Sequence, residues 1–386
     1  MDSGTDSRQL QEAAPARRRW RLPALLVLLA ALAGGWWFFW FQAAERAQET
    51  MAAWLAREAK SERFYGCAHQ EIGGFPFRFE LRCKGPQAEF RALQSPLSLR
   101  AADLLVALQI YQPDLLIAEI DGPMMAGPSG GPLHYAADWS LARASLRGTP
   151  RAPERLSLEF DEPVIERRED GATASVFAAE RAELHGRLAA GSVHDAPVID
   201  VALSLMAATV PELHPLAARA FDLDLDLQLV GLRNFDPKPW QARFREIQKT
   251  GGRIEIRNLR LQQDEALATA SGTLKLTEAG YLDGELQLTA SGLDKVLPAL
   301  GADQLVRPGS SAGKKLDAAL ESLDRVMPGL GDFARQKAGL GVAAGAAFLG
   351  EPTELEGRKA VRLPLQFVEG EMRLGPLKLG RIAPLF

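Results

Sequence analysis

The sequence has few of the residues that build reactive or metal-binding sites. Of its 386 residues, two are cysteine and five are histidine. The histidines, His69, His134, His185, His194 and His214, show no ligand spacing such as H-x-x-x-H. The separation of the two cysteines excludes a redox C-x-x-C motif. We therefore predict no metal, no cofactor and no catalytic residue, and expect a protein that is not an enzyme.

Three short motifs of known enzymes or ion sites are incomplete. Gly127–Gly131 satisfies G-x-S-x-G but lacks the strand before it and the helix after it. Ser311–Lys314 satisfies S-x-x-K without the partner motifs of the enzymes that use it. Asp222–Asp226 alternates like a calcium loop, but Leu227 and Arg233 replace the required Gly and Glu. Loop, helix cap and polar strand face are the simpler interpretations.

The chain also lacks an excess of positive charge. Its formal net charge is −4. Five arginines stand among the first 41 residues, which carry three acidic residues, so the remainder is acidic. An acidic body argues against nucleic acid as a partner.

One long apolar run lies near the N-terminus. Leu22–Phe41 contains no charged residue and would form a helix ~30 Å long, enough to cross a bilayer. Tryptophans gather at its far end and arginines at Arg17–Arg21, which predicts a cytoplasmic tail over 1–21 and a single-pass anchor over 22–41. The rest would lie in the periplasm, outside the inner membrane. A cleaved signal peptide is the alternative.

Residues 42–63 follow the anchor without proline or glycine and are rich in alanine. This composition predicts a helical stem. At 1.5 Å per residue, such a stem would lift the following domain ~30 Å from the membrane.

The two cysteines, Cys67 and Cys83, lie on either side of an unusual turn. In an exported domain a lone pair predicts a disulfide, worth ~3 kcal/mol for a loop of this size. Two buried thiols are the alternative. Facing cysteines would pair His69 with Leu81 and Glu71 with Phe79. The turn motif consists of Gly74, Phe75, Pro76, Phe77 and Arg78.

From residue 64 onward, short alternating segments with turn residues between them predict a mainly β (α+β) fold. We expect a large curved antiparallel sheet system forming one elongated, groove-like domain over 64–386, with a helical insertion near 293–349. A split into two lobes near 190–235 is the alternative. Residues 123–132 read as a loop, and 133–146 and 175–188 read as single strands.

Several strands carry continuous apolar faces, which predict either a filled core or a groove that shelters acyl chains. The possible groove residues are Leu223, Leu225, Leu227, Leu229, Ile254, Ile256, Leu274, Leu276, Leu286 and Leu288.

Three stretches carry a resemblance to a known family: Gly74–Arg78, Ser271–Leu297 and Leu374–Leu377. With them the chain resembles an uncharacterised proteobacterial family, domain of unknown function 2125. The G-F-P turn is more distantly similar to the AsmA-like anchored periplasmic proteins, β-rich grooves implicated in moving or sensing envelope lipids. The AsmA-like proteins thought to bridge both membranes are much longer, so the resemblance does not imply such a bridge here.

The resemblance implies a role in envelope lipid homeostasis. We therefore expect a membrane-anchored protein that binds phospholipid or another amphiphile in an apolar groove. A non-catalytic scaffold or assembly partner for other envelope proteins is the alternative.

Overall fold

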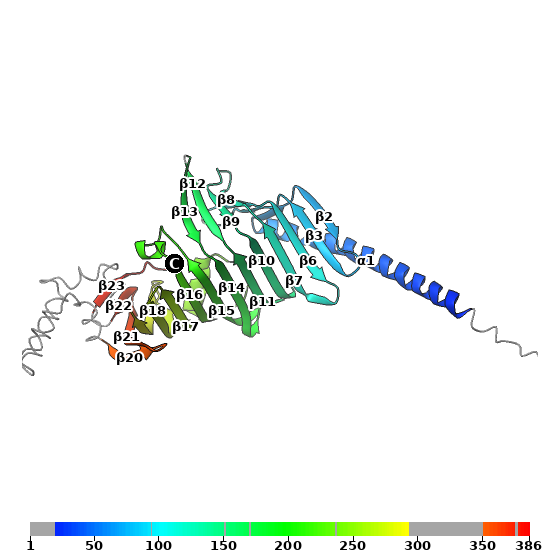
Figure 1. Cartoon of the computed structure of the whole chain (residues 1–386). Helices are drawn as coiled ribbons and strands as arrows, with labels where there is room; N and C mark the ends of the chain where they lie inside the picture. Colours follow the sequence, from blue (N-terminus) through cyan, green and yellow to red (C-terminus); the bar gives the residue numbers. More distant parts are fainter. Residues whose placement is uncertain are drawn as a thin grey trace, which may run out of the picture.

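The structure is a computed structural model that describes residues 20–292 and 350–386, apart from 94, 150, 151, 170, 236, 237, 375 and 376. The helical insertion expected near 293–349 lies outside the described residues. The fold is mainly β, as predicted. The described part forms a seven-stranded and a sixteen-stranded antiparallel sheet, with two α-helices and a 3-10 turn, η2 (Pro215–Ala218). Figure 1 shows the large sheet extending away from the long helix α1.

The smaller sheet follows the order β1-β4-β5-β8-β9-β12-β13. Its strands are β1 (Arg63–Gly66), β4 (Gln87–Phe90), β5 (Leu97–Arg100), β8 (Met124–Pro128), β9 (Tyr135–Asp138), β12 (Val164–Glu169) and β13 (Ala172–Ala178). The larger sheet begins in the order β2-β3-β6-β7-β10-β11-β14. These strands are β2 (His69–Gly73), β3 (Arg78–Lys84), β6 (Asp103–Gln109), β7 (Gln112–Asp121), β10 (Leu141–Thr149), β11 (Ala152–Asp161) and β14 (Arg181–Ser192).

The larger sheet continues through β15 to β19 and ends with β21 to β23, and β20 pairs with β21. These strands are β15 (Asp195–Ala208), β16 (Phe221–Val230), β17 (Arg253–Gln263), β18 (Ala266–Leu276), β19 (Leu282–Ser291), β20 (Glu351–Leu355), β21 (Arg358–Val368), β22 (Glu371–Leu374) and β23 (Leu377–Arg381).

The two sheets are one meander folded along a line. Every strand of the small sheet is separated from its continuation in the large sheet by two residues, and both sheets keep the same order. We call these seven two-residue breaks the crease: 67–68, 85–86, 101–102, 122–123, 139–140, 162–163 and 179–180. Backbone hydrogen bonds continue through it, from Gly85 N to Ala102 O (2.8 Å) and from Ser140 N to Asp161 O (3.0 Å). Each strand of the small sheet therefore continues, through the crease, into a strand of the large sheet. We call the small sheet and the large sheet the two arms.

The sequence accounts for part of the crease. Proline at 86, 123 and 163 removes a backbone donor, and proline is found mainly at the edges and breaks of sheets. Glu162 adopts a left-handed backbone, with φ at 51°. Two predictions were wrong here: residues 123–132 contain β8, and the stretches 133–146 and 175–188 each divide at the crease. Trp139-Ser140 and Ala179-Glu180 carry neither proline nor glycine that would have revealed this.

Helix α1 (Arg21–Lys60) runs through the predicted anchor and the predicted stem without a break. Its apolar part is not buried, and the helix is long and apolar enough to cross a membrane. The tryptophans of its second half contact both arms: Trp40 stacks on Phe79 of β3 (5.4 Å between ring centres) and Trp54 on Tyr65 of β1 (5.1 Å). The stem therefore packs along the domain, and the prediction that it lifts the domain away was wrong.

The large sheet has an apolar face and a polar face. One register row crosses twelve strands from β3 to β21 and is apolar throughout: Leu81, Val106, Ala118, Ala144, Leu158, Leu184, Leu203, Leu225, Leu259, Ala270, Leu288 and Leu363. We call the side of this row the apolar face. The adjacent row, on the polar face, runs Glu119, Arg143, Glu159, Glu183, Ser204, Asp224 and Arg260. Alternation within each strand produces both faces.

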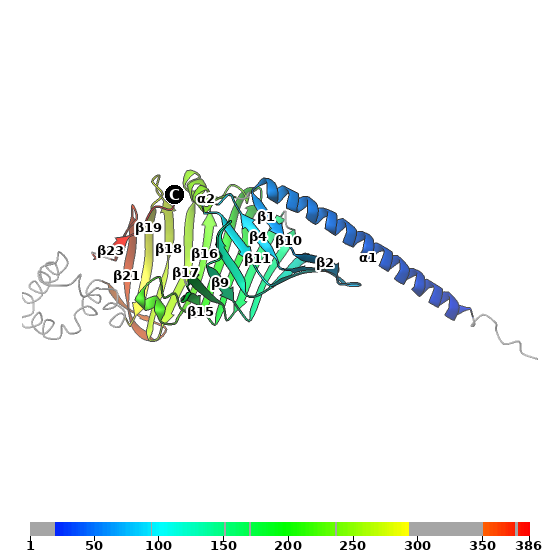
Figure 2. The ribbon, with the colours of Figure 1, turned by 90° about the horizontal axis from the view of Figure 1, so that it is seen from above.

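The C-terminal part holds the packed core. One cluster joins Ala270, Leu274, Leu286 and Phe367 from β18, β19 and β21. A second cluster packs Ile247 of α2 (Trp240–Lys249) against Leu232 and Leu276. Figure 2 shows α2 at the end of the strands near β16.

Candidate functional site: the apolar face of the creased sheet

The apolar face is not buried evenly. In β18 and β19, Leu274 and Leu286 are 5% exposed, as in any protein core. In β11 and β14, Leu156 and Leu184 are 43% and 38% exposed on the same face. Both described clusters of buried apolar residues lie toward the C-terminal part. The middle of the apolar face therefore presents leucine side chains to solvent, and such a surface is typical of a binding site.

The ten predicted groove residues lie on this face, which the register shows strand by strand. Three of them, Leu274, Leu276 and Leu286, are buried in the two clusters and serve as core. The β16 leucines at 223, 225, 227 and 229 are half-buried and continue the accessible part of the face. The structure thus divides the predicted set between a packed end and an accessible middle.

The small sheet has an apolar row of its own, in which four residues are in register: Tyr65, Ala88, Leu99 and Ala126. Tyr65 packs on Phe90 within the small sheet (5.9 Å between ring centres) and also on Trp54 of α1. The same helix stacks Trp40 on Phe79, which belongs to the apolar face of the large sheet. Trp40 and Trp54 are ~21 Å apart along the helix. Helix α1 therefore contacts the apolar faces of both arms at the first strands.

Apolar side chains continue from α1 along the face. Phe79 is in register with Leu108, and the row goes on through Leu116 and Leu146 to the exposed Leu156. At the crease, Trp139 packs its ring on Phe160 (5.6 Å) and donates a hydrogen bond to Ile120 O (2.7 Å). The sequence analysis did not identify Trp40 and Trp139 as site residues. Both are tryptophans that lie outside the alternating strand pattern, and this could have drawn attention to them.

The predicted disulfide is present: Cys67 at the crease is bonded to Cys83, which is 1% exposed. The predicted register was wrong. His69 pairs with Lys84 and Glu71 with Arg82. Cys67 lies before β2, so the disulfide joins it diagonally to Cys83 of β3, which is in register with Gln70. Both side chains are exposed, so no buried polar group needs a partner there.

The predicted turn motif closes the β2–β3 hairpin. Gly74 has φ at 97°, and a Cβ atom there would stand 2.7 Å from Arg78 O, so only glycine fits. Arg78 N donates to Gly74 O (3.1 Å), and the peptide bond between Phe75 and Pro76 is cis. Phe75 stands in the turn, as expected.

The incomplete motifs have structural explanations where the structure describes them. Ser129 lies in the turn after β8, so the expectation that no strand precedes it was wrong, but a strand, β9, follows it in place of the required helix. Ser311–Lys314 lie outside the described residues. The β16 aspartates occupy the polar face, where Asp224 accepts from Ser204 Oγ and Asp222 from Ala207 N, each at 2.8 Å. Among the described residues, no group of three or more His, Cys, Asp or Glu could hold a metal ion.

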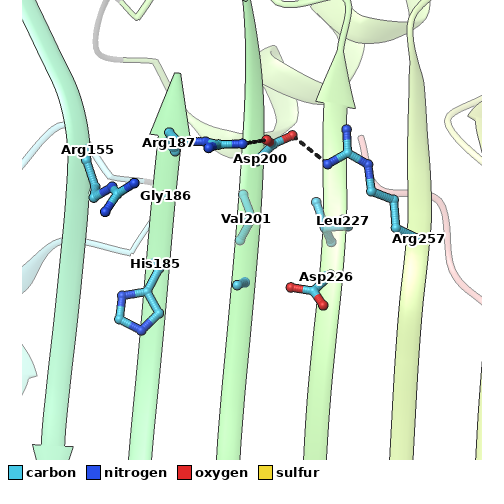
Figure 3. A pocket seen from close by; sticks show the side chains of 10 residues that line it. Arg155, His185, Gly186, Arg187, Asp200, Val201, Asp226, Leu227 and Arg257 are labelled. Carbon is cyan, nitrogen blue, oxygen red and sulfur yellow. Dashed lines mark hydrogen bonds and ion pairs between the residues drawn. The ribbon is translucent and has the colours of Figure 1, made fainter. Parts of the chain in front are cut away.

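The polar face carries a hollow of about 430 Å³ over β11, β14, β15, β16 and β17 (Figure 3). Asp200 stands between two arginines there, 2.6 Å from Arg187 Nη2 and 3.1 Å from Arg257 Nη1. The hydrogen bond from Arg187 is the largest influence and holds the pKa of Asp200 below its usual value, although desolvation opposes it. Arg155 and His185 also face the hollow. These ion pairs join β14, β15 and β17, and the pair with Arg257 reaches across the intervening β16.

A comparison with known protein families identifies the family of the chain. A family model for uncharacterized proteins conserved in bacteria (DUF2125) matches residues 40–383. The chain belongs to this family. The match begins at Trp40, the residue that joins α1 to the hairpin, and takes in both arms of the sheet. None of the curated proteins matches the chain. The more distant similarity to AsmA-like proteins stays a prediction.

Proposed function

We propose that the protein is anchored in the inner membrane by α1 and binds the acyl chains of a phospholipid or similar amphiphile on the accessible part of the apolar face, in the periplasm. The observation that supports this proposal best is the partial exposure of Leu156 and Leu184 in the middle of a sheet face that is apolar from strand to strand. Binding would bury this surface, and no covalent chemistry is needed.

The driving force is hydrophobic. Each methylene group removed from water contributes about 0.8 kcal/mol, so ten methylenes of one acyl chain contribute about 8 kcal/mol before the costs of association. Leucine, isoleucine and alanine offer no specific partner to a polar headgroup. The face therefore fits an apolar chain and leaves the headgroup at its margin.

The position of α1 favours a lipid over other apolar ligands. The unburied apolar part of α1 passes into Trp40, and Trp40 stacks on Phe79 at the start of the apolar face. A lipid leaving the bilayer beside α1 would meet apolar side chains along its way. A scaffold that receives an apolar segment of another envelope protein is the second candidate, supported by the same exposed leucines.

The test uses the full chain in liposomes that contain a phospholipid with a photoreactive group near the middle of one acyl chain. After illumination, mass spectrometry maps the labelled peptides. We expect label on β11 and β14 as well as on α1. Leu184→Glu is expected to reduce the β11 and β14 label at least fivefold.

Met206→Glu is the matched control, because Met206 is 49% exposed and its register partner Arg181 lies on the polar face. It should leave the label unchanged. Label confined to α1, or an equal loss in both variants, would contradict lipid binding and favour the scaffold.

A further inference from the structure

Two neighbouring turns of the large sheet expose aromatic side chains. Phe75 and Phe77, in the β2–β3 turn, are 47% and 67% exposed. Tyr111, in the β6–β7 turn, is 75% exposed. Ile110 N donates a hydrogen bond to Phe77 O (3.1 Å), so the two turns lie side by side. We call Phe75, Phe77 and Tyr111 the turn aromatics.

Helix α1 holds these turns at the end of its apolar run. Trp36 Nε1 donates to Pro76 O (3.0 Å), and Trp40 Nε1 donates to Arg78 O (3.2 Å). The Phe75 ring lies 5.6 Å from that of Trp40 and 6.5 Å from that of Phe41. The hairpin is thus fixed to the last turns of the segment that is long and apolar enough to cross a membrane.

The same level of α1 is surrounded by exposed aromatic rings. Trp37, Phe38, Phe39 and Phe41 are between 48% and 61% exposed. Aromatic side chains are enriched where a membrane protein crosses from hydrocarbon to headgroups. Because Trp36 and Trp40 are bonded to the hairpin, a bilayer that reaches these tryptophans also reaches the turn aromatics.

The charges near the turns complement a lipid surface. Arg78 and Arg82 both pair with Glu80, which is 4% exposed, at 2.5 Å and 2.9 Å. The two arginine side chains are 58% and 62% exposed. Both guanidinium groups are thus accessible beside the exposed aromatic rings, and exposed arginines next to apolar rings suit phosphate headgroups.

We propose that the β2–β3 and β6–β7 turns form a second membrane contact, with the turn aromatics inserted in the headgroup region of the bilayer that α1 enters. The occupant of this surface is the lipid bilayer itself. The proposal shares with the proposed function only the membrane anchoring of α1, and it requires no ligand on the apolar face. Its consequence is orientation: the first strands of both arms are held against the membrane instead of turning freely above it.

The test uses the full chain in liposomes, with one environment-sensitive NBD probe on a single added cysteine. Phe77→Cys and Tyr111→Cys report on the turns, while Cys67 and Cys83 are joined in the disulfide and do not react. Leu213→Cys is the matched control, since Leu213 is 75% exposed, like Tyr111, but precedes η2 and lies outside the turns. Lipids carrying a nitroxide near the headgroup serve as quenchers.

We expect quenching at Phe77→Cys and Tyr111→Cys to exceed that at Leu213→Cys at least threefold, with blue-shifted emission. Equal quenching at the three positions would overturn the proposal. A failure of α1 to anchor is recognised separately, because the protein would then not float with the liposomes. A failure of lipid binding on the apolar face would change the photolabelling pattern and leave the quenching as expected.

Discussion

The two ends of the large sheet use the same strand pattern for different purposes. From β17 to β22, apolar side chains of one face pack into a cluster around Leu274 and Leu286, each 5% exposed. From β6 to β14, side chains in the same register rows stay half-exposed, and Leu184 reaches 38%. Alternation of apolar and polar residues therefore fixes which side of a strand is apolar, while burial depends on what lies opposite.

The difference separates stability from binding. A packed cluster loses free energy with every atom removed from it, because a cavity remains. An accessible leucine contributes little to folding, since it is only partly removed from water in the folded state. The C-terminal part is thus where the fold is stabilised, and the middle of the apolar face is where a sequence change affects binding.

The largest expected effect tests this division directly. Leu286→Ala should lower the free energy of unfolding by about 2–5 kcal/mol, because it leaves a cavity in the packed cluster. Leu184→Ala, on the accessible part of the face, should cost less than about 1 kcal/mol. Urea unfolding followed by circular dichroism measures both. Equal losses would show that the middle of the face is packed as tightly as the C-terminal end.

The disulfide tests how the first strands are held at the crease. Replacing both Cys67 and Cys83 by serine should cost about 3 kcal/mol in the chain-entropy model, for a closed loop of this size. The loss should appear first in the N-terminal part, as faster proteolysis near β1 and β2. A double variant as stable as the parent would mean that α1 and the crease already hold these strands.

A smaller effect is expected at the buried carboxylate beside the C-terminal cluster. Glu246 is 9% exposed and accepts hydrogen bonds from Arg233 N (2.5 Å) and Lys238 Nζ (2.6 Å). Burial raises the pKa of Glu246, but these bonds outweigh it, and the net pKa lies below that of an ordinary glutamate. Glu246→Gln should therefore cost about 1.5–3 kcal/mol at pH 7, the value of hydrogen bonds to a charged group.

The sign of the pH dependence follows from the lowered pKa. The stabilisation by Glu246 is complete above the pKa of an unfolded glutamate, about 4.3, and disappears as the pH falls through the lower folded value. The difference in unfolding free energy between Glu246→Gln and the parent protein should therefore narrow as the pH falls below about 4.3. Glu278→Gln, at an exposed position, is the control, and its unfolding free energy should equal that of the parent protein at every pH. A constant gap from pH 7 to pH 3 would contradict the assignment.

The smallest effect is expected in the polar hollow. Asp200→Asn removes the ion pairs with Arg187 and Arg257, whose side chains are 56% and 50% exposed. Asp200 itself is 17% exposed, but both arginines are open to solvent, so the pairs should contribute at most about 1 kcal/mol. Urea unfolding should show a loss within this range, and 1 M salt should shrink it. A loss above 2 kcal/mol would make the polar face a second stabilising region and weaken the contrast drawn above.

The sequence was sufficient to predict most strands and which of their faces is apolar. It was not sufficient to predict the crease. Alternation at 221–230 placed four leucines on one side, and the register of β15, β16 and β17 agrees. Proline at 86, 123 and 163 marked three of the seven breaks, but Trp139-Ser140 looks like continuous strand. A bend shared by neighbouring strands is a property of the whole sheet, so no single segment encodes it.

The predictions of the hairpin register and of the position of α1 were wrong for a related reason. We paired Cys67 with Cys83 as facing residues, yet a disulfide also forms between a residue at the break and one inside the next strand. The stem part of α1, residues 42–63, was expected to lift the domain ~30 Å from the membrane. Its contacts depend on Trp40 and Trp54, which meet Phe79 and Tyr65 only after the sheet has folded.

The equal strand order on both sides of the crease makes the molecule modular. Each bent strand pairs with the strands next to it in the chain, so its contacts are local and the domain resembles a stack of repeated units. Inserting or deleting one bent hairpin would lengthen or shorten both arms together and leave the remaining pairings intact. The reach of the apolar face away from α1 is therefore a quantity that evolution, or an engineer, can change in steps of two strands.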